Sequence, residues 1–249
     1  MRVKIVLHFK GDLKLPISYN NLIQGLIYSH VSDTNKRDIL HNYGYMVGSK
    51  KIKLMTFSRL LGEYEINSKE ITFRSQITLI FSSFDDELVS DISYNLMKDK
   101  NMYLNGCKLD VFSVQPYFFD IEKYVNRKSY VIEMLSPLSV SSTNQDGKRV
   151  YFKPDTIEFV DALRKNIKTK LKAIKQENKE FSFNIMYNNI PNHRDEKVIY
   201  FKNTFIKGYN GIFTVNTDPF IMKLLYYSGI GSKNSEGFGC FNILGIKND

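Results

Sequence analysis

One order of secondary-structure elements occurs twice along the chain, and this repetition restricts the possible folds more than any other feature. In the first half, strand-like alternation and helical periodicity follow one another as strand, helix, two strands, helix and strand. The second half restarts this order after a connecting segment between Pro116 and Lys128. The order is that of the split βαββαβ unit. We therefore predict an α+β fold of two tandem ferredoxin-like (RRM-like) domains, over residues 1–118 and 128–249.

The expected elements follow from apolar spacing and capping residues. Asp218 at the N-cap, Pro219 in the first turn and Gly229 just past the end bracket one short helix. The expected helices cover residues 18–31, 35–43, 85–100, 155–176 and 218–228. The expected strands cover residues 2–9, 52–60, 70–81, 108–115, 129–135, 181–187, 198–206, 211–216 and 240–246.

The excess of basic residues narrows the class of partner. A formal net charge of +9 and a pI of about 9.3 favour a polyanion such as nucleic acid, or an acidic surface. Two cysteines, Cys107 and Cys240, are too few for a disulfide framework or a thiolate zinc site. The sequence has no apolar run near the roughly 18 residues of a membrane span, and its first residues alternate like a strand, unlike a signal peptide. We therefore expect a cytoplasmic protein without a membrane segment.

Residues 229–239, GIGSKNSEGFG, form the most distinctive short segment. Two glycine–apolar–glycine pairs flank a polar stretch that contains Lys233. Glycines accept positive φ, so such a loop can direct several N–H groups at one anion. Because the segment follows a helix C-terminus, where the macrodipole disfavours an anion, a bound phosphate would depend on these N–H groups and on Lys233. A glycine-rich turn that serves only packing is the alternative, and the spacing leaves both open.

Two nucleotide-binding motifs are excluded for this segment. A Walker loop needs Gly-Lys-Ser/Thr at the start of a helix, and this segment reads Gly-Ser-Lys without a following helix. A Rossmann fingerprint follows the first strand of a βαβ unit, whereas only one expected strand remains here.

Candidate residues for chemistry gather in the first expected helix and in the segment that follows it. On a helical wheel His30 lies within the apolar stripe, which favours a structural role, and Tyr28 lies on the opposite side, where it can face a ligand. His41 ends the second short helix, and a helix C-terminus raises the pKa of a histidine above its usual value of about 6.5. Lys51 and Lys53 occupy alternate strand positions and point away from the core.

Other polar residues give weaker signals. Four dispersed histidines form no metal-ligand cluster, so we expect no metal. Basic residues surround the apolar stripe of the helix expected at 155–176, which is typical of a solvated face, although such a face can also track a phosphate backbone. These residues are Arg164, Lys165, Lys168, Lys170, Lys172 and Lys175.

Four stretches together carry a resemblance to a known family. They are GIGSKNSEGFG at 229–239, LIQGLIY at 22–28, LH at 40–41 followed by KLMTFSRLLG at 53–62, and LSPLSV at 135–140. The first is similar to the G-apolar-G-x5-G-apolar-G loop of RAMP-type CRISPR-associated proteins. More narrowly, the chain resembles their repeat-processing endoribonucleases, which cut the long CRISPR transcript (pre-crRNA) into guide RNAs.

This resemblance implies metal-independent RNA cleavage by a tyrosine, a histidine and a lysine, without a cofactor. By local motif these residues are Tyr28, His41 and Lys53, with Lys51 competing for the role of Lys53. The 2′-hydroxyl would attack the adjacent phosphorus and leave a 2′,3′-cyclic phosphate and a 5′-hydroxyl. His41 would act as general acid or base, Lys53 would stabilise charge on the phosphate, and Tyr28 would position the hydroxyl.

The resemblance also implies the partners. The residues expected to bind repeat RNA are Gly229, Gly231, Lys233, Gly237, Gly239 and Lys51. Other CRISPR-associated subunits are candidate partners, and the chain is expected to act in the prokaryotic cytoplasm as a monomer or homodimer. Two alternatives stay open: a non-catalytic RNA-binding RAMP subunit of a CRISPR ribonucleoprotein, and a nucleotide-dependent enzyme that uses the glycine segment.

Overall fold

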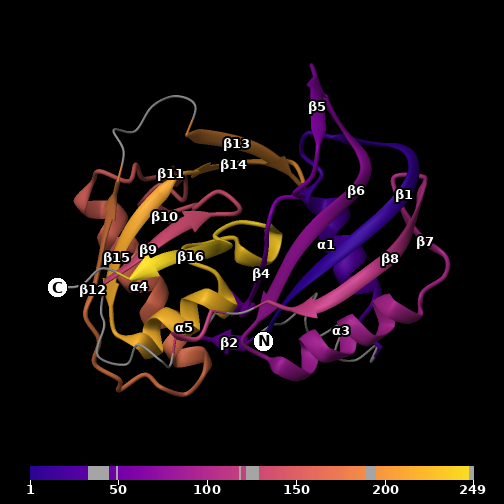
Figure 1. The fold of residues 1–249 in the computed structure, drawn as a ribbon. Coiled ribbons are helices and arrows are strands. Elements are labelled where there is room, and N and C mark those ends of the chain that lie inside the picture. Colours follow the sequence, from indigo (N-terminus) through magenta and orange to yellow (C-terminus); the bar gives the residue numbers. More distant parts are fainter. Residues whose placement is uncertain (33–44, 49, 118, 122–128, 189–194, 247–249) are drawn as a thin grey trace.

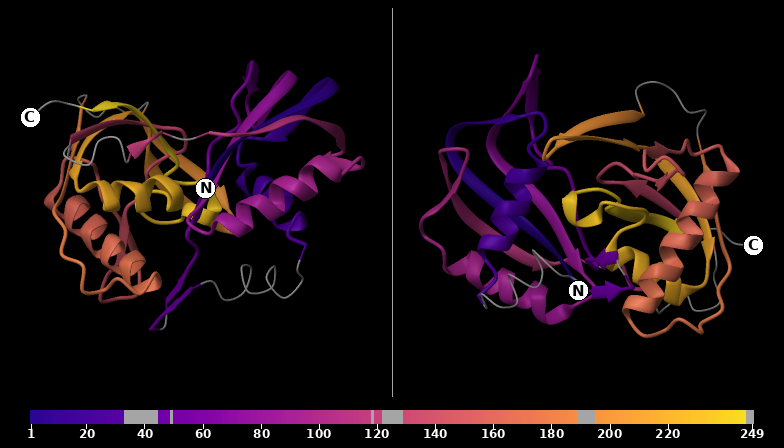
Figure 2. Two further views of the ribbon diagram at one scale, coloured as in Figure 1. Left: turned by 60° about the horizontal axis from the view of Figure 1, so that its bottom comes forward. Right: turned by 180° about the vertical axis from the view of Figure 1, so that it is seen from behind.

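The computed structural model describes residues 1–32, 45–48, 50–117, 119–121, 129–188 and 195–246 (Figure 1). The two larger sheets of the described chain are antiparallel and lie side by side, and helices cover one face of each. Seen from behind, the first helix of each half lies in front of its sheet (Figure 2, right).

The first sheet has the strand order β4-β6-β1-β8-β7, with β5 paired to β6. Its strands are β1 (Arg2–Pro16), β4 (Met55–Phe57), β5 (Tyr64–Asn67), β6 (Glu70–Ser83), β7 (Met102–Leu104) and β8 (Cys107–Pro116). Its helices are α1 (Asn20–Ser29) and α3 (Asp86–Lys98). Alternation explains the strands: Val3, Ile5 and Leu7 of β1 are buried, and β1 pairs antiparallel with both β6 and β8.

The second sheet has the order β12-β15-β9-β16. Its strands are β9 (Ser129–Met134), β12 (Phe183–Tyr187), β15 (Ile212–Thr217) and β16 (Phe241–Ile246), and its helices are α4 (Ile157–Ala173) and α5 (Pro219–Ser228). Within each unit the spatial order is second, third, first and fourth strand, so β4-β6-β1-β8 and β12-β15-β9-β16 share one topology. This repeated topology agrees with the expected split βαββαβ fold.

Each sheet has its own hydrophobic core. One cluster of buried residues extends from Val3 to Leu109, and a second extends from Ile121 to Ile243. In α4 the second core receives Phe159, Leu163 and other residues at spacings of four, as helical periodicity requires.

Buried polar contacts join the two halves. The Arg2 guanidinium, 1% exposed, donates to the Phe241 carbonyl at 2.7 Å and lies 4.3 Å from the ring centroid of Tyr226. The backbone N–H of Arg59 donates to the Leu135 carbonyl at 2.8 Å. A site built from both halves is therefore held in a fixed geometry.

Short strand pairs account for most differences from the expected elements. The stretch 198–206, expected as one strand, is the hairpin β13 (Glu196–Phe201) and β14 (Thr204–Tyr209), which turns at Lys202 and Asn203 with φ of 42° and 65°. Two further pairs were not expected: β10 (Ser141–Thr143) with β11 (Arg149–Tyr151), and β2 (Tyr45–Val47) with β3 (Lys50–Ile52).

Some helix and strand ends also differ. The first strand continues beyond residue 9 to Pro16 through a register shift between His8 and Asp12. The helix α4 is capped by the Thr156 hydroxyl, which accepts from the Phe159 N–H, and α1 starts at Asn20 without a side-chain cap. The helix expected at 35–43 lies outside the described residues. Within the described ranges, no helix combines the length and hydrophobicity needed to cross a membrane.

Candidate functional site

The side chains of Tyr28 and Lys53 meet at the junction of α1 with the segment between β3 and β4. The Lys53 ammonium donates to the Tyr28 hydroxyl at 3.1 Å and lies 5.1 Å from the centroid of its ring. Tyr28 belongs to the first hydrophobic core and is 6% exposed, yet it lines the cavity described below. Two of the three residues proposed for catalysis are therefore in direct contact.

Burial keeps the phenol of Tyr28 neutral. Removal from water raises its pKa to about 12; hydrogen bonding with Ser235 acts in the opposite direction, and the charge of Glu236 adds to the increase. At neutral pH this hydroxyl can donate a hydrogen bond but is a poor base.

In the glycine segment, residues 229–239, several backbone N–H groups already donate hydrogen bonds to carbonyls of the protein. The N–H groups of Ile230, Ser232 and Gly239 donate to the carbonyls of Gly239, Ser139 and Pro137, each at 2.9 Å. The N–H groups of Glu236 and Gly237 donate within the segment. These N–H groups do not converge on one external anion, so the expected anion nest is not the arrangement that the structure shows.

The four glycines allow close packing. Gly229, Gly231, Gly237 and Gly239 are all buried with φ between 73° and 83°. A Cβ on Gly231 would lie 2.6 Å from the Ser139 carbonyl oxygen, and one on Gly239 would lie 1.9 Å from that of Ile230. The glycines that were expected to contact RNA directly thus face protein, and the partly exposed polar residues between them face the cavity.

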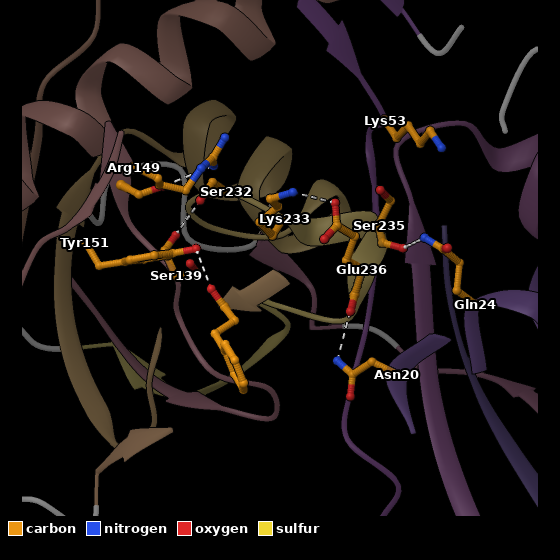
Figure 3. A network of polar contacts seen from close by, with 12 residues as sticks. Asn20, Gln24, Lys53, Ser139, Arg149, Tyr151, Ser232, Lys233, Ser235 and Glu236 are labelled. Atoms are coloured by element: carbon orange, nitrogen blue, oxygen red, sulfur yellow. Dashed lines mark hydrogen bonds and ion pairs between the residues drawn. The ribbon is translucent and has the colours of Figure 1, made fainter. Parts of the chain in front are cut away.

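Those polar residues contact the first half of the chain (Figure 3). The side-chain amide of Gln24 donates to the Ser235 carbonyl at 2.6 Å, and that of Asn20 donates to the Glu236 carbonyl at 2.8 Å. Both donors lie on α1, the helix whose last turn contains Tyr28. One helix therefore positions the glycine segment and the candidate catalytic tyrosine.

Lys233, expected to hold phosphate, already has a partner. Its φ is 63°, and its ammonium lies 2.9 Å from the Glu236 carboxylate (Figure 3). An RNA phosphate would have to compete with this carboxylate for Lys233.

A cavity of about 970 Å³ opens between the two halves. One face of α4, the hairpin β10–β11, the tip of β13–β14, the glycine segment and the end of α1 line it. Its described basic lining residues are Lys53, Arg149, Lys165, Lys170, Lys202 and Lys233, and its one described acidic lining residue is Glu236. Such a wall attracts a polyanion.

The remaining predicted residues are placed as follows. His41 lies outside the described residues. The backbone of Lys51 belongs to β3, and its side chain is outside the described part of the structure. His30 is 7% exposed; its Nδ1 lies 2.8 Å from the Leu26 carbonyl and its Nε2 lies 3.1 Å from Asp99, as suits the structural role expected for it.

Sequence reasoning missed part of the basic wall. Arg149 and Lys202 lie in hairpins that were not expected, so no pattern assigned them to a site. Lys170 was assigned to a solvated face but is 1% exposed. The helical wheel does contain a signal, because Lys170 follows Leu163 by seven residues and so lies about 20° from that buried leucine.

Comparison with known protein families gives a match in the second half of the chain. A family model described as CRISPR associated protein Cas6, C-terminal, matches residues 120–243. The chain belongs to the Cas6 family. CRISPR-associated endoribonuclease Cas6 1 of Methanocaldococcus jannaschii is 24% identical over 248 residues, which cover 96% of this chain and 91% of that protein.

Solved structures extend the Cas6 likeness to the whole fold. One, described as the characterization of a Cas6-related gene from Pyrococcus furiosus, matches with a TM-score of 0.80 and 22% identity over 98% of each chain. Another, described as an RAMP protein binding different RNA substrates, matches with a TM-score of 0.78 and 20% identity. This match covers 98% of this chain and 100% of the other chain. These structures confirm the tandem ferredoxin-like fold. The family model and the M. jannaschii relative confirm the resemblance to the repeat-processing RAMP group.

Proposed function

We propose that this chain is an endoribonuclease that cleaves CRISPR repeat RNA within pre-crRNA to release guide RNAs. One observation carries the proposal: the Lys53 ammonium and the Tyr28 hydroxyl, 3.1 Å apart, lie at the wall of a basic cavity built from both halves of a Cas6 chain. The similarity to the M. jannaschii endoribonuclease supports the same activity.

The proposed reaction is an internal transesterification. The 2′-hydroxyl of the nucleotide before the cut forms a bond to the adjacent phosphorus, and the bond from that phosphorus to the 5′-oxygen breaks. One proton leaves the 2′-oxygen and one is delivered to the 5′-oxygen. The products are a 2′,3′-cyclic phosphate and a 5′-hydroxyl, and no metal takes part in the proposed steps.

Each residue has a separate role in this proposal. Lys53 stabilises the negative charge that accumulates on the phosphate in the transition state. Tyr28, neutral at physiological pH, holds a substrate oxygen by hydrogen bonding. His41 transfers the proton as general acid or base, an effect typically worth about 10²–10⁴ in rate.

The basic cavity supports RNA binding by both halves. Its described lining includes six cationic side chains and one carboxylate. Each phosphate contact releases counterions, so the affinity should fall steeply with salt, with a slope of about −0.7 per contact for a single strand. In this proposal the glycine segment contributes to RNA binding through the shape of the cavity wall and through Lys233 and Ser235, more than through the N–H groups of its glycines.

Two finer statements complete the proposal. We infer domains at 1–118 and 128–249, which the separate hydrophobic clusters support. We also infer action in the prokaryotic cytoplasm as a monomer or homodimer, with other CRISPR-associated subunits as further partners.

A repeat RNA with a single 2′-deoxy substitution tests the function. The natural RNA should be cut, and the RNA that lacks only the attacking hydroxyl should bind with equal affinity and stay intact. Binding of both RNAs without any cut would favour the non-catalytic RAMP subunit. Cleavage of the deoxy RNA at the same site would contradict attack by the 2′-hydroxyl.

A further inference from the structure

Lys170 is a buried lysine that the proposed cleavage chemistry does not use. It lies on α4 with 1% of its surface exposed, whereas Lys165 and Lys168 on the same helix are exposed. It nevertheless contributes to the lining of the basic cavity. An ammonium removed from water is costly unless hydrogen bonds replace its hydration.

Among the described residues, the hydrogen-bond partners of Lys170 belong to the end of α5 and to the glycine segment. Its Nζ donates to the Ser228 carbonyl at 3.2 Å, to the Ser228 hydroxyl at 3.1 Å and to the Asn234 side-chain oxygen at 2.9 Å. It also donates to the Gly229 carbonyl. An ammonium has three donors and no acceptor, so this set of oxygens suits the protonated amine. The carbonyl end of a helix favours a cation further.

Asn234 transmits this interaction through the glycine segment. Its side-chain N–H₂ donates to the Ile230 carbonyl at 3.0 Å and to the Phe238 carbonyl at 3.1 Å. Lys170 and Asn234 therefore connect the first glycine pair to the second. Lys233 and Ser235, the residues on either side of Asn234, both line the cavity.

The charges around Lys170 leave its ammonium without a neutralising carboxylate. Within the described part of the chain, no carboxylate lies at ion-pair distance from Lys170, and Glu236 is paired with Lys233. The other charged groups that line the cavity are cationic: Lys165 of α4, Arg149 of β11, Lys202 of the hairpin and Lys53 of the first half. Burial lowers the pKa of Lys170 to about 7. A phosphate in the cavity would favour its protonated form.

We infer that Lys170 is a positioning residue whose ammonium fixes the shape of the glycine segment. We also infer that Lys170 takes up a proton from solvent when RNA binds in the cavity. The identity of the ligand rests on the proposed function. Binding should therefore weaken as the pH rises through neutrality, by up to about tenfold per pH unit, since one proton is taken up.

Calorimetry in buffers of different ionisation enthalpy measures this proton uptake. The ligand is the 2′-deoxy repeat RNA, which cannot be cut by the proposed route. The protein carries His41→Ala and His193→Ala, so that neither of these two histidines contributes to the proton uptake. At pH 7.5 we expect net uptake of roughly half a proton or more, absent when Lys170→Met is added. Lys165→Met, on the same helix and cavity wall, should lower the affinity but keep the uptake.

A measurement on the natural side chain covers the case in which Lys170→Met does not fold. Lysine-selective ¹³Cε labelling should show one lysine that titrates near neutrality in the free protein and at higher pH with RNA bound. An unshifted titration, or proton uptake that persists in Lys170→Met, would overturn the inference. Failure of the natural protein to bind any repeat RNA would instead contradict the proposed function.

Discussion

The phenolic oxygen of Tyr28 accepts a hydrogen bond from the ammonium of Lys53 at 3.1 Å, and this contact joins a helix to a segment 25 residues further along the chain. Burial keeps the phenol neutral, with a pKa raised to about 12. The pair therefore presents one fixed positive charge and one neutral hydroxyl to the cavity.

Replacing either member should affect the rate more than the affinity. Lys53→Met removes charge stabilisation from the transition state, so we expect single-turnover cleavage to fall about 10²–10³-fold. Tyr28→Phe keeps the ring and should cost about tenfold or more, with RNA affinity within about threefold. Lys165→Met is the control: it should weaken binding but leave the rate at saturating RNA unchanged. Equal rates for all three variants would contradict the assignment.

His41→Ala should retain RNA affinity and reduce cleavage by at least about 10²-fold, because the proposed proton transfer loses its donor and acceptor. The pH–rate profile should also lose its dependence near neutrality. Single-turnover rates between pH 5.5 and 8.5 test this. Near-natural rates in the variant would shift proton transfer to another group.

Replacing glycines of the glycine segment by larger residues should destabilise the protein through steric overlap. An added Cβ at Gly237 would lie 2.5 Å from the ring of Phe57, and one at Gly231 would lie 2.6 Å from the Ser139 carbonyl oxygen. Gly237→Val and Gly231→Val should each lower the free energy of unfolding by about 3 kcal/mol or more and weaken RNA binding. Gly106→Val is the matched control, because Gly106 also has a positive φ, +80°, but no heavy atom lies within 4 Å of a Cβ added there. Urea denaturation should show a smaller loss for Gly106→Val, and equal losses would remove the packing argument.

Glu236→Gln should strengthen RNA binding. This substitution removes the single described carboxylate of the cavity wall and releases Lys233 from its 2.9 Å ion pair. We expect the dissociation constant to fall about threefold or more near 0.1 M salt and less at 0.5 M, where charges are screened. Glu65→Gln, which alters an exposed ion pair with Arg74 away from the cavity, should have no effect. An unchanged constant for Glu236→Gln would indicate that RNA does not contact Lys233.

The stability of the fold should depend on pH through Lys170. Its pKa is lowered by burial to about 7, from the 10.5 of an exposed lysine. Between pH 7 and 10.5 Lys170 binds more protons in the unfolded chain than in the folded protein, so the free energy of unfolding rises with pH over this window. Below about pH 7 the contribution of Lys170 to this free energy is constant. Urea denaturation from pH 6 to 9.5 should show this rise for the natural protein and for Lys165→Met, and a flatter curve for Lys170→Met. Parallel curves for all three would contradict the assigned pKa.

The sequence alone predicts the repeated fold because buried alternation, as at Val3, Ile5 and Leu7, is a local signal. It does not predict the hairpin turn at Lys202 and Asn203, because neither is glycine or proline and both take left-handed conformations inside an apolar stretch. That missed turn also hid Lys202 from the expected site.

The site was predictable where local motifs carry the chemistry and unpredictable where two distant segments meet. Tyr28 and Lys53 were named from their motifs, and they are in contact. The positive φ of the glycines was expected from composition, but only the structure shows which atoms their missing Cβ groups would meet. The pairing of Lys233 with Glu236 depends on a turn geometry that residue spacing does not specify.

End-group analysis of cleaved repeat RNA in EDTA tests the central claim most directly. We predict a single cut that leaves a 2′,3′-cyclic phosphate upstream and a 5′-hydroxyl downstream, at the same rate with or without magnesium. Intact RNA in EDTA, or products that end in a 3′-hydroxyl and a 5′-phosphate once magnesium is added, would contradict cleavage by the RNA's own 2′-hydroxyl.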